Sequence, residues 1–436
     1  QPLVHSGNTW NLGNVTSMDR MFAYATSFTT NNYDIFLYSQ ANNPGIESNI
    51  TIDVSSKYCD STSRTFLTGT KNWTINDSGA SSDCNKFVST WAVSSGTFEL
   101  PLKDYANITI DWGDSSTSTH TNQAFPTHSY SSAGTYTITI AVNDGAKDIG
   151  EMYLSGHASR TLIRTIENWG EGKWETFDAA FKGATNLTIP ATDEPDLSLT
   201  TDMDSAFRDC TSLVGTTLND WNTATVTEMN NMFFGATSFN GNIGSWNTAI
   251  VTNMQSMFYG ATSFNQNINT SGSSWNTAAV TSMDYMFYRA TAFNGNITSW
   301  NTAAVPDMSN MFFGATTFNQ NITSWNTAIV TDMSSMFYGA TAFNQNINTS
   351  GDSWNTVAVT DMSHMFRGAT AFNGNISSWN TAKVTDMQSM FTSATTFNQD
   401  ITSWNTAIVT NMNNMFNGAS VFNKDINTSG DSWNTA

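Results

Sequence analysis

The C-terminal half of this 436-residue chain contains a tandem repeat, and that repeat limits the fold more than any other feature. The tripeptide Trp-Asn-Thr recurs at intervals of 25 or 29 residues. It begins at Trp221, Trp246, Trp275, Trp300, Trp325, Trp354, Trp379, Trp404 and Trp433. Every third interval is the long one, so a unit of 79 residues contains three repeats. This periodicity predicts a solenoid, because one repeat alone cannot bury its own apolar side chains.

Each repeat follows the pattern W-N-T-A-x-V-T-x-M-x-x-M-F-x-G-A-T-x-F-N. In one representative repeat, Met333, Met336 and Phe337 have the spacing of a single turn of α- or 3₁₀-helix, which Gly339 is expected to end. The stretch 343–347 is expected to be extended. One strand and one short helical turn per repeat are typical of a leucine-rich-repeat-like solenoid. We expect about ten coils whose Met and Phe residues form the core.

The long repeats carry four additional residues, and these are expected to loop outward on one side of the solenoid. The insertions lie within Ile268–Trp275, Ile347–Trp354 and Ile426–Trp433. A packed column with a fixed rise per coil cannot hold extra residues inside. The loops would therefore form a row of Ser- and Gly-rich protrusions suited to lateral contacts or to glycans.

Two polar positions recur in the repeats, and each allows two interpretations. The Asn after the second Phe forms either a row of ligand-binding amides or an internal ladder that pairs backbone groups of adjacent coils. The ladder is favoured. The Asp of the Val-Thr-Asp-Met segment forms either a cation-binding row or a cap for the turn that follows. Capping is favoured for Asp307, Asp332, Asp361 and Asp386.

The repeat pattern resembles the BspA-like surface-protein repeat, a divergent leucine-rich repeat. The resemblance covers about residues 168–436, and its first coils are divergent. Cys210 stands where other coils have Ala, which predicts a small buried residue. The resemblance implies a solenoid and a cell-surface setting, and it implies no catalytic residues.

Upstream, alternating β-branched and polar residues predict strands, and three short motifs resemble a PKD-type β-sandwich. The motifs are Trp112-Gly113-Asp114, His128-Ser129-Tyr130 and Gly134-Thr135-Tyr136. Ser115 replaces a Gly that is usual in that family. The resemblance covers about residues 86–145 and implies a spacer, or a domain that contacts proteins or carbohydrate.

Four segments follow from these observations. Residues 1–40 form an N-terminal segment that contains an isolated repeat at 8–28, and residues 41–85 form a β-rich region. Residues 86–148 form the PKD-like sandwich, and residues 149–436 form the solenoid. The expected fold is thus mostly β, with short helical turns. A disulfide between Cys59 and Cys84 is predicted, which would fit an oxidising compartment.

Composition favours an extracellular protein. Only 12% of residues are charged, against about 25% in typical globular proteins, so neutral polar groups supply solubility. The net charge of −19 disfavours nucleic acid and anionic lipid as partners. No apolar run is long enough to span a bilayer. The chain starts at Gln1 without a Met, which suits a mature secreted chain, and a piece cut from a longer protein would start in the same way. Sequons for N-glycosylation occur, but an Asn-rich chain produces them by chance; examples are Asn72, Asn107, Asn296 and Asn375.

We expect no enzymatic activity and no cofactor. The histidines lack metal-ligand spacing, and neither a nucleophile elbow nor a phosphate-binding loop is present. Two functions from different classes remain. The first is a structural protein that polymerises into an extracellular filament or surface coat. The second is a monomeric adhesin that binds a host or surface protein or glycan.

The filament hypothesis rests on the two ends of the sequence. The last repeat stops at Trp433-Asn434-Thr435-Ala436, and the isolated N-terminal repeat supplies the residues that would follow Ala436. We therefore predict that residues 8–28 complete the C-terminal solenoid of the next subunit, in a head-to-tail homopolymer. Two alternatives remain open: the N-terminal repeat caps its own solenoid, or the chain is a fragment. The predicted contact residues are Val15, Met18, Met21, Phe22, Phe28 and Trp433.

Overall fold

The computed structural model describes residues 15, 17–22, 30–43, 45–58, 61–80, 83–143, 145, 147–269, 275–426 and 433. The chain divides into two compact units. The first contains Gln1–Gly150, Leu162–Lys173 and Thr188–Asp196, and the second contains Glu151–Thr161, Trp174–Leu187 and Leu197–Ala436. The described part is mostly β and turn, with few short helices, in agreement with the predicted class.

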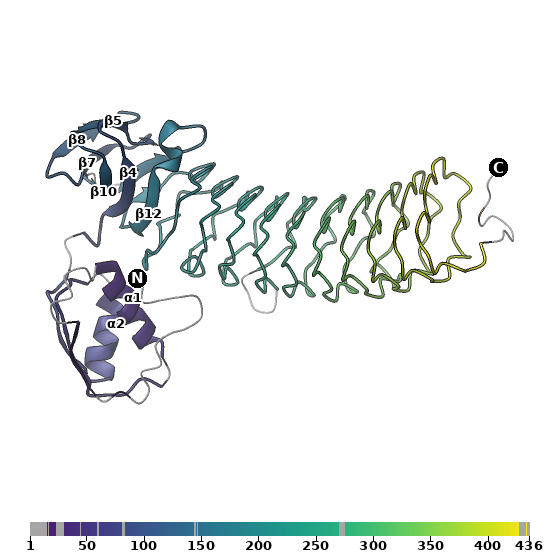
Figure 1. Cartoon of the computed structure of the whole chain (residues 1–436), viewed down its shortest axis with the longest axis horizontal. Helices are drawn as coiled ribbons and strands as arrows, with labels where there is room; N and C mark the ends of the chain where they lie inside the picture. The colour runs from purple at the N-terminus through teal and green to yellow at the C-terminus, as the bar shows by residue number, and fades with distance from the viewer. Residues whose placement is uncertain are drawn as a thin grey trace. The chain divides into compact units, whose positions relative to one another are not determined.

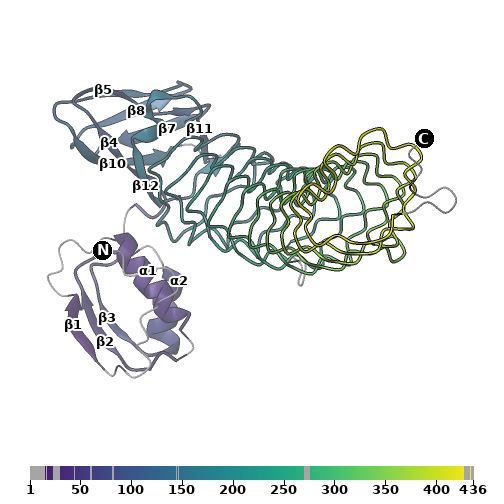
Figure 2. The ribbon, with the colours of Figure 1, turned by 45° about the vertical axis from the view of Figure 1, so that its right-hand side comes forward.

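The N-terminal part of the first unit is an α/β structure. Its parallel sheet has the order β1-β2-β3, built from Met18–Phe22, Thr51–Val54 and Thr74–Asn76. Figure 2 shows the helices on one face of this sheet. They are α1 (Thr30–Ala41), α2 (Ser61–Thr65) and the π-helical turn η1 (Phe66–Thr70).

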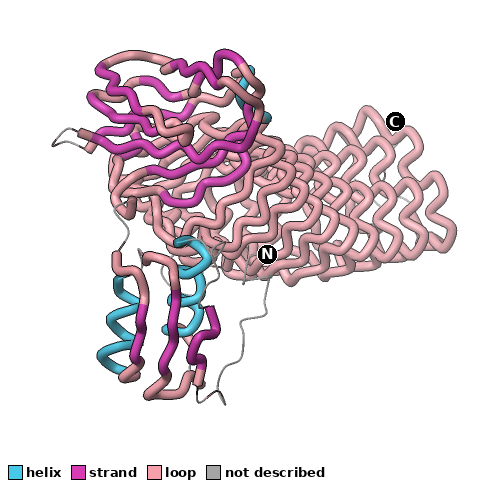
Figure 3. Tube along the Cα trace, turned by 60° about the vertical axis from the view of Figure 1, so that its left-hand side comes forward, coloured by secondary structure: helices cyan, strands magenta, loops and turns pink. Residues whose placement is uncertain are grey.

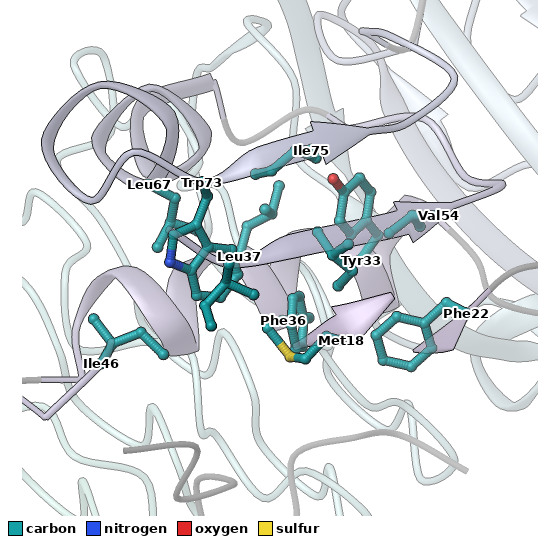
Figure 4. Packing of buried hydrophobic residues seen from close by; sticks show 12 residues of the cluster. Met18, Phe22, Tyr33, Phe36, Leu37, Ile46, Val54, Leu67, Trp73 and Ile75 are labelled. Carbon is teal, nitrogen blue, oxygen red and sulfur yellow. The ribbon is translucent and has the colours of Figure 1, made fainter. Parts of the chain in front are cut away.

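One hydrophobic core joins these elements, so the predicted boundary at residue 40 differs from the structure. Met18 and Phe22 of β1 pack with Phe36 and Leu37 of α1 and with Trp73 beside β3 (Figure 4). Segments 1–40 and 41–85 thus contribute to a single α/β core, and 41–85 is not purely β. A two-stranded fragment could not bury these side chains, whereas a sheet covered by helices can.

The predicted sandwich region contains three sheets. The largest has the order β12-β4-β10-β7-β8 and the others have the orders β13-β11-β6 and β5-β9. The strands are Phe87–Val93 (β4), Gly96–Glu99 (β5), Leu102–Lys103 (β6), Asn107–Asp111 (β7), Thr117–Thr121 (β8), Thr127–Tyr130 (β9), Gly134–Val142 (β10), Asp148–Met152 (β11), Ile163–Asn168 (β12) and Lys173–Trp174 (β13). A 3₁₀ turn, η2, covers Ala158–Thr161.

Alternation along these strands positions the core. Strand β4 buries every second residue, including Trp91, and Ile108 and Ile138 are fully buried in β7 and β10. The predicted end at residue 148 is too early, because β12 pairs antiparallel with β4 and adds Ile163 to the same sheet.

In the second unit, successive repeats stack on one another. We call Trp174–Leu187 and Leu197–Ile426 the coil stack. Figure 1 shows its coils side by side along the chain. One Phe ring from each coil enters a single column with centroid separations of 5.5–5.7 Å. The column is Phe181, Phe207, Phe233, Phe258, Phe287, Phe312, Phe337, Phe366, Phe391 and Phe416. The expectation that Phe residues of successive coils form the core is confirmed for this column, in which Phe258, Phe287 and Phe312 stack directly on one another.

Alternate backbone amides hold adjacent coils together. The amides of Met333, Ser335, Phe337 and Gly339 each donate to a carbonyl of the following coil at 2.7–3.0 Å. The amides between them close turns within their own coil, as Met336 N does on Met333 O at 3.3 Å. This alternation requires left-handed residues at Ser335 (φ 56°) and Gly339 (φ 65°).

The predicted helical turn is therefore a run of consecutive turns, and Figure 3 shows the coils as loops and turns throughout. A helix directs every amide along its own axis and leaves none for the next coil. The isolated β-bridges within the described coils fall mainly at the Val-Thr-x-Met segment, as in Asp332↔Asp361, and the stretch 343–347 forms no strand.

Replacement of a strained residue tests this backbone. Ser393 occupies the position of Gly339 with φ 59°, so it carries a Cβ in the left-handed region. We expect Ser393→Gly to raise the free energy of unfolding by about 1 kcal/mol, measured by chemical denaturation. The matched Gly339→Ala should lower it by a similar amount, because its Cβ would meet no atom nearer than 3.8 Å and only the backbone conformation is penalised. Equal stability of both variants and the parent chain would contradict the left-handed backbone conformation assigned to residues 339 and 393.

In the described insertion, Ile347 and Trp354 are fully buried, and the residues between them, 348–353, lie outside the packed core. Ser350 and Ser353 exchange backbone hydrogen bonds of 3.0 and 3.1 Å, and Gly351 between them is exposed. The other two insertions fall largely outside the described residues. The prediction that all three emerge on the same side therefore stays a prediction.

Candidate functional site

The last coil that the structure describes, up to Ile426, has apolar side chains that are more exposed than their counterparts in earlier coils. Val409, Met412, Phe416 and Phe422 are only partly buried. Their counterparts one coil earlier have no solvent exposure: Val384, Met387, Phe391 and Phe397. The difference arises because each coil is covered on both sides by neighbours, and the described residues place a neighbour on only one side of this coil.

Backbone donors lie on the same surface. In the preceding coil, four alternate amides donate to carbonyls of the last coil at 2.8–2.9 Å. The corresponding amides of the last coil are those of Met412, Asn414, Phe416 and Gly418. No further coil among the described residues accepts from them. We call the surface formed by these amides and the partly buried apolar residues the C-terminal face.

The predicted contact residues lie in different places. Met18 and Phe22 are 4% and 8% exposed within the N-terminal core, and Val15 packs against that core. Met21 is 37% exposed. Trp433 stacks on Trp404 with the ring centroids 6.5 Å apart, so it continues the Trp column of its own chain. Phe28 and most of the repeat 8–28 lie outside the described residues.

Strand β1 shows that the repeat motif has more than one conformation. Met336 and Phe337 are both fully buried in the coil stack, whereas Met21 and Phe22 have opposite exposure in β1. A strand directs successive side chains to opposite faces, and consecutive turns do not. Strand β1 lies at the edge of its sheet, paired with β2 only, among the described strands.

The repeated Asn residues form the expected internal ladder. The side-chain oxygen of each Asn accepts from the amide of the equivalent Asn in the next coil, at 2.8–3.0 Å. The participants are Asn240, Asn265, Asn294, Asn319, Asn344, Asn373, Asn398 and Asn423. These carboxamide oxygens are therefore occupied by the protein itself.

The repeated Asp residues bond to the turn that follows them. Each carboxylate accepts from the amide two residues later, as Asp332 does from Ser334 at 2.7 Å. The capping interpretation is confirmed, although the capped element is a turn and not a helix. Burial raises the pKa of Asp307, against hydrogen bonds from Ser309, and the nearby carboxylates of Asp332 and Asp284 add to the rise.

An outer aromatic row is a feature that the sequence analysis missed. The residue after Met-Phe is Phe or Tyr in five successive coils, and these half-buried rings stack with centroids 4.3–4.4 Å apart. The row is Phe234, Tyr259, Tyr288, Phe313 and Tyr338. The Arg208 guanidinium lies 4.1 Å from the centroid of Phe234, and that of Arg367 lies 5.4 Å from that of Tyr338. Because the ring faces contact one another, they are not free to stack on a sugar.

In the sandwich region, Asp114, Ser116 and His128 form a grouping that resembles a catalytic set. His128 Nε2 lies 2.8 Å from Asp114 Oδ2 and 3.4 Å from Ser116 Oγ. One nitrogen thus meets both partners, so the imidazole cannot relay a proton between them. His128 also stacks on Trp112, and Tyr130 donates to the Trp112 carbonyl at 2.8 Å. This grouping joins the turn between β7 and β8 to strand β9.

These contacts predict a pH dependence. Hydrogen bonds from Ser116, and then from His128, lower the pKa of Asp114 to about 2. The folded-state pKa lies below the usual value, so the carboxylate stabilises the fold above about pH 4 and loses this effect as pH falls towards 2. We expect Asp114→Asn to flatten the acid limb of a plot of unfolding free energy against pH. An unchanged acid limb would contradict this role.

The cysteines differ in state. Cys84 is disulfide-bonded, and Cys59, its predicted partner, lies outside the described residues. Cys210 is free and fully buried, as expected, and burial raises the pKa of its thiol. Within the described ranges, no three His, Cys, Asp or Glu side chains gather closely enough to hold a metal ion. None of the helices described has the length and apolar character needed to cross a membrane.

The stacked coils define a tandem-repeat protein, and a comparison with known families agrees. The chain belongs to the family described as "Mycoplasma protein of unknown function, DUF285", whose profile matches residues 3–44, 175–272, 269–351 and 347–436. The N-terminal match includes the isolated repeat. Searches of curated proteins and of solved structures found no match.

Proposed function

We propose that this protein is an extracellular structural protein whose copies assemble head-to-tail into a filament or surface coat. We assign the coil stack to a BspA-like, leucine-rich-repeat-like solenoid and the region around β4–β12 to a PKD-like sandwich. The stacked Phe column supports the first assignment. The mutual contacts of Trp112, Asp114, His128 and Tyr130 support the second, because they join the motifs on which that resemblance rests.

The C-terminal face is the observation that carries this proposal. It combines partly buried apolar side chains, such as Met412 and Phe416, with a row of backbone donors. A surface of this kind pairs readily with another edge. Covering a half-exposed large apolar side chain stabilises a contact by about 1 kcal/mol.

The edge of β1 is the complementary surface that we propose. It bears the same Val-x-x-Met-x-x-Met-Phe motif that follows Trp-Asn-Thr-Ala in complete repeats. Met18 and Phe22 are held in their own core, so β1 docks as an edge strand of a folded unit and not as a released segment. The exposed Met21 then contacts the neighbour. This contact joins different surfaces on the two subunits, so it repeats from subunit to subunit and builds an open filament when the rotation between neighbours does not close a ring.

Two variants test the contact on the full chain. Met21→Arg alters the β1 edge, and Met412→Arg alters the C-terminal face. We expect each to weaken self-association at least about tenfold in sedimentation velocity and to abolish filaments in negative-stain images. Mixed in equal amounts, the two variants should sediment faster than either variant alone, because each retains the surface that the other lacks and one head-to-tail contact per pair is restored.

The control is Val214→Arg, which alters an exposed side chain elsewhere in the coil stack. It should assemble as the parent chain does. If the parent chain is monomeric at every concentration, the proposal is wrong and the alternative, a monomeric adhesin, is favoured. If both variants polymerise normally, the contact surfaces are wrong.

A further inference from the structure

Four of the exposed large aliphatic side chains in the described coils lie in one column, while Val214, Val421 and Ile426 are exposed elsewhere. Leu199, Ile250, Ile329 and Ile408 occupy the position before the buried Val of each repeat, or its equivalent, and are 47–49% exposed. The adjacent Val357 is 40% exposed. We call this column the aliphatic stripe; in chain order it contains Leu199, Thr225, Ile250, Ala279, Ala304, Ile329, Ala358, Lys383 and Ile408.

Isoleucine recurs at every third coil of the stripe. Ile250, Ile329 and Ile408 are separated by 79 residues, which is three coils, or about 15 Å at the spacing of adjacent strands. Ala279 and Ala304 fill the two coils between the first pair. The stripe thus has protruding isoleucines at every third coil, with a gap two coils wide at Ala279 and Ala304 and a gap one coil wide at Ala358, beside the exposed Lys383.

We propose that the aliphatic stripe is a lateral interface with a second copy of this chain, packed antiparallel. The two-fold axis passes through Ala304, the middle residue of the stripe. In this register Ile329 enters the gap at Ala279, and Ile250 meets Ala358. Leu199 and Ile408 meet at the ends, so the stripes overlap along their full length.

Two arguments identify a second copy as the occupant. The three-coil spacing of protrusions and gaps is matched by another chain with the same 79-residue unit. Charge is complementary too, because Lys383, the only charged residue of the stripe, faces the coil of Thr225 and the half-buried Glu228. A shift of the register by one coil is less favourable in either direction. In one direction Ile250 would meet the protruding Ile329, and in the other it would meet Lys383.

This interface goes beyond the head-to-tail contact and uses other residues, so the two are separable. A chain carrying Met21→Arg, which blocks the head-to-tail contact, should remain a dimer in sedimentation velocity. Adding Ile329→Asp should weaken that dimer at least about tenfold, because the carboxylate would lie against the apolar gap at Ala279. Adding Val214→Asp, outside the stripe, should leave the dimer unchanged. A monomeric Met21→Arg chain, or a dimer unaffected by Ile329→Asp, would overturn the proposal.

A cysteine experiment tests the axis without disturbing the fold. Ala304→Cys places two thiols at the two-fold axis, so mild oxidation should yield a disulfide-linked dimer on non-reducing gels. Ile408→Cys faces Leu199 of the other copy and should link no better than Val214→Cys. Equal linking by Ala304→Cys and Ile408→Cys would indicate parallel packing and refute the antiparallel register, as would linking by neither.

Discussion

Phe337→Ala is expected to lower the free energy of unfolding by about 3–5 kcal/mol. The Phe337 ring has no solvent exposure and stacks between Phe312 and Phe366, with centroids 5.7 and 5.6 Å away. It also lies 3.9 Å from the ring of Phe343. Truncation leaves a cavity that adjacent coils cannot fill, because the backbone hydrogen bonds between coils fix their backbones. Chemical denaturation gives the magnitude.

The location of the effect is as informative as its size. Coils contact only their neighbours, so hydrogen exchange should accelerate most in the coils around Phe337. Phe313→Ala is the matched control, because Phe313 lies next to the same column but in the outer aromatic row, where it is half-buried. It should cost about 1 kcal/mol. Equal losses for the two variants would contradict the assigned core.

Gly374→Gln should be nearly as damaging, although four of the eight coils with the Phe-Asn pair have Gln at this position. A Cβ on Gly374 would lie 1.9 Å from the carbonyl oxygen of Gln345, and a Cβ on Gly295 would lie 2.0 Å from that of Gln266. Backbone atoms cannot move aside as side chains do. We expect a loss of about 3 kcal/mol, measured by chemical denaturation.

These glycines follow the long repeats. Gln266 and Gln345 belong to coils with four additional residues, and Gly295 and Gly374 belong to the coils that come next. A Cβ on Gly241 would lie 2.0 Å from the carbonyl oxygen of Gly215, so the same close approach also occurs where no four-residue insertion precedes the glycine. Gln399→Ala is the control, because it removes a hydrogen bond to Asn373 but adds no Cβ, and it should cost about 1 kcal/mol. An unchanged free energy of unfolding in Gly374→Gln would contradict this prediction, because it would show that the backbone near the Gln345 carbonyl can move away from the added Cβ.

The periodic parts of the molecule were predictable from the sequence. One requirement predicts the Phe column, the Asn ladder and the buried Cys210. Each coil must bury the apolar side chains of its neighbour and pair the polar groups that face it. The turn conformation was not predictable from Met333, Met336 and Phe337, because their spacing suits a helix equally well. Only the left-handed positions Ser335 and Gly339 distinguish the two, and Ser gives no signal of that conformation.

The N-terminal unit shows where local sequence is insufficient. Residues 15–22 have the same motif as the coils, yet they form strand β1, because the segments that pack on them are α1 and β2. The sequence of residues 30–76 has no periodic pattern that predicts α1 or β2. The surfaces that we propose for assembly depend on which residues lack a neighbour, and that is a property of the folded stack.

The backbone hydrogen bonds between adjacent coils have a mechanical consequence. They run from coil to coil, so a pull along the stack loads them in tension, one interface at a time. A 25-residue coil adds about 5 Å to the stack but releases roughly 85 Å of chain when it unravels. A tether built from such coils would lengthen stepwise under shear and absorb work at each step. It would unfold one coil at a time.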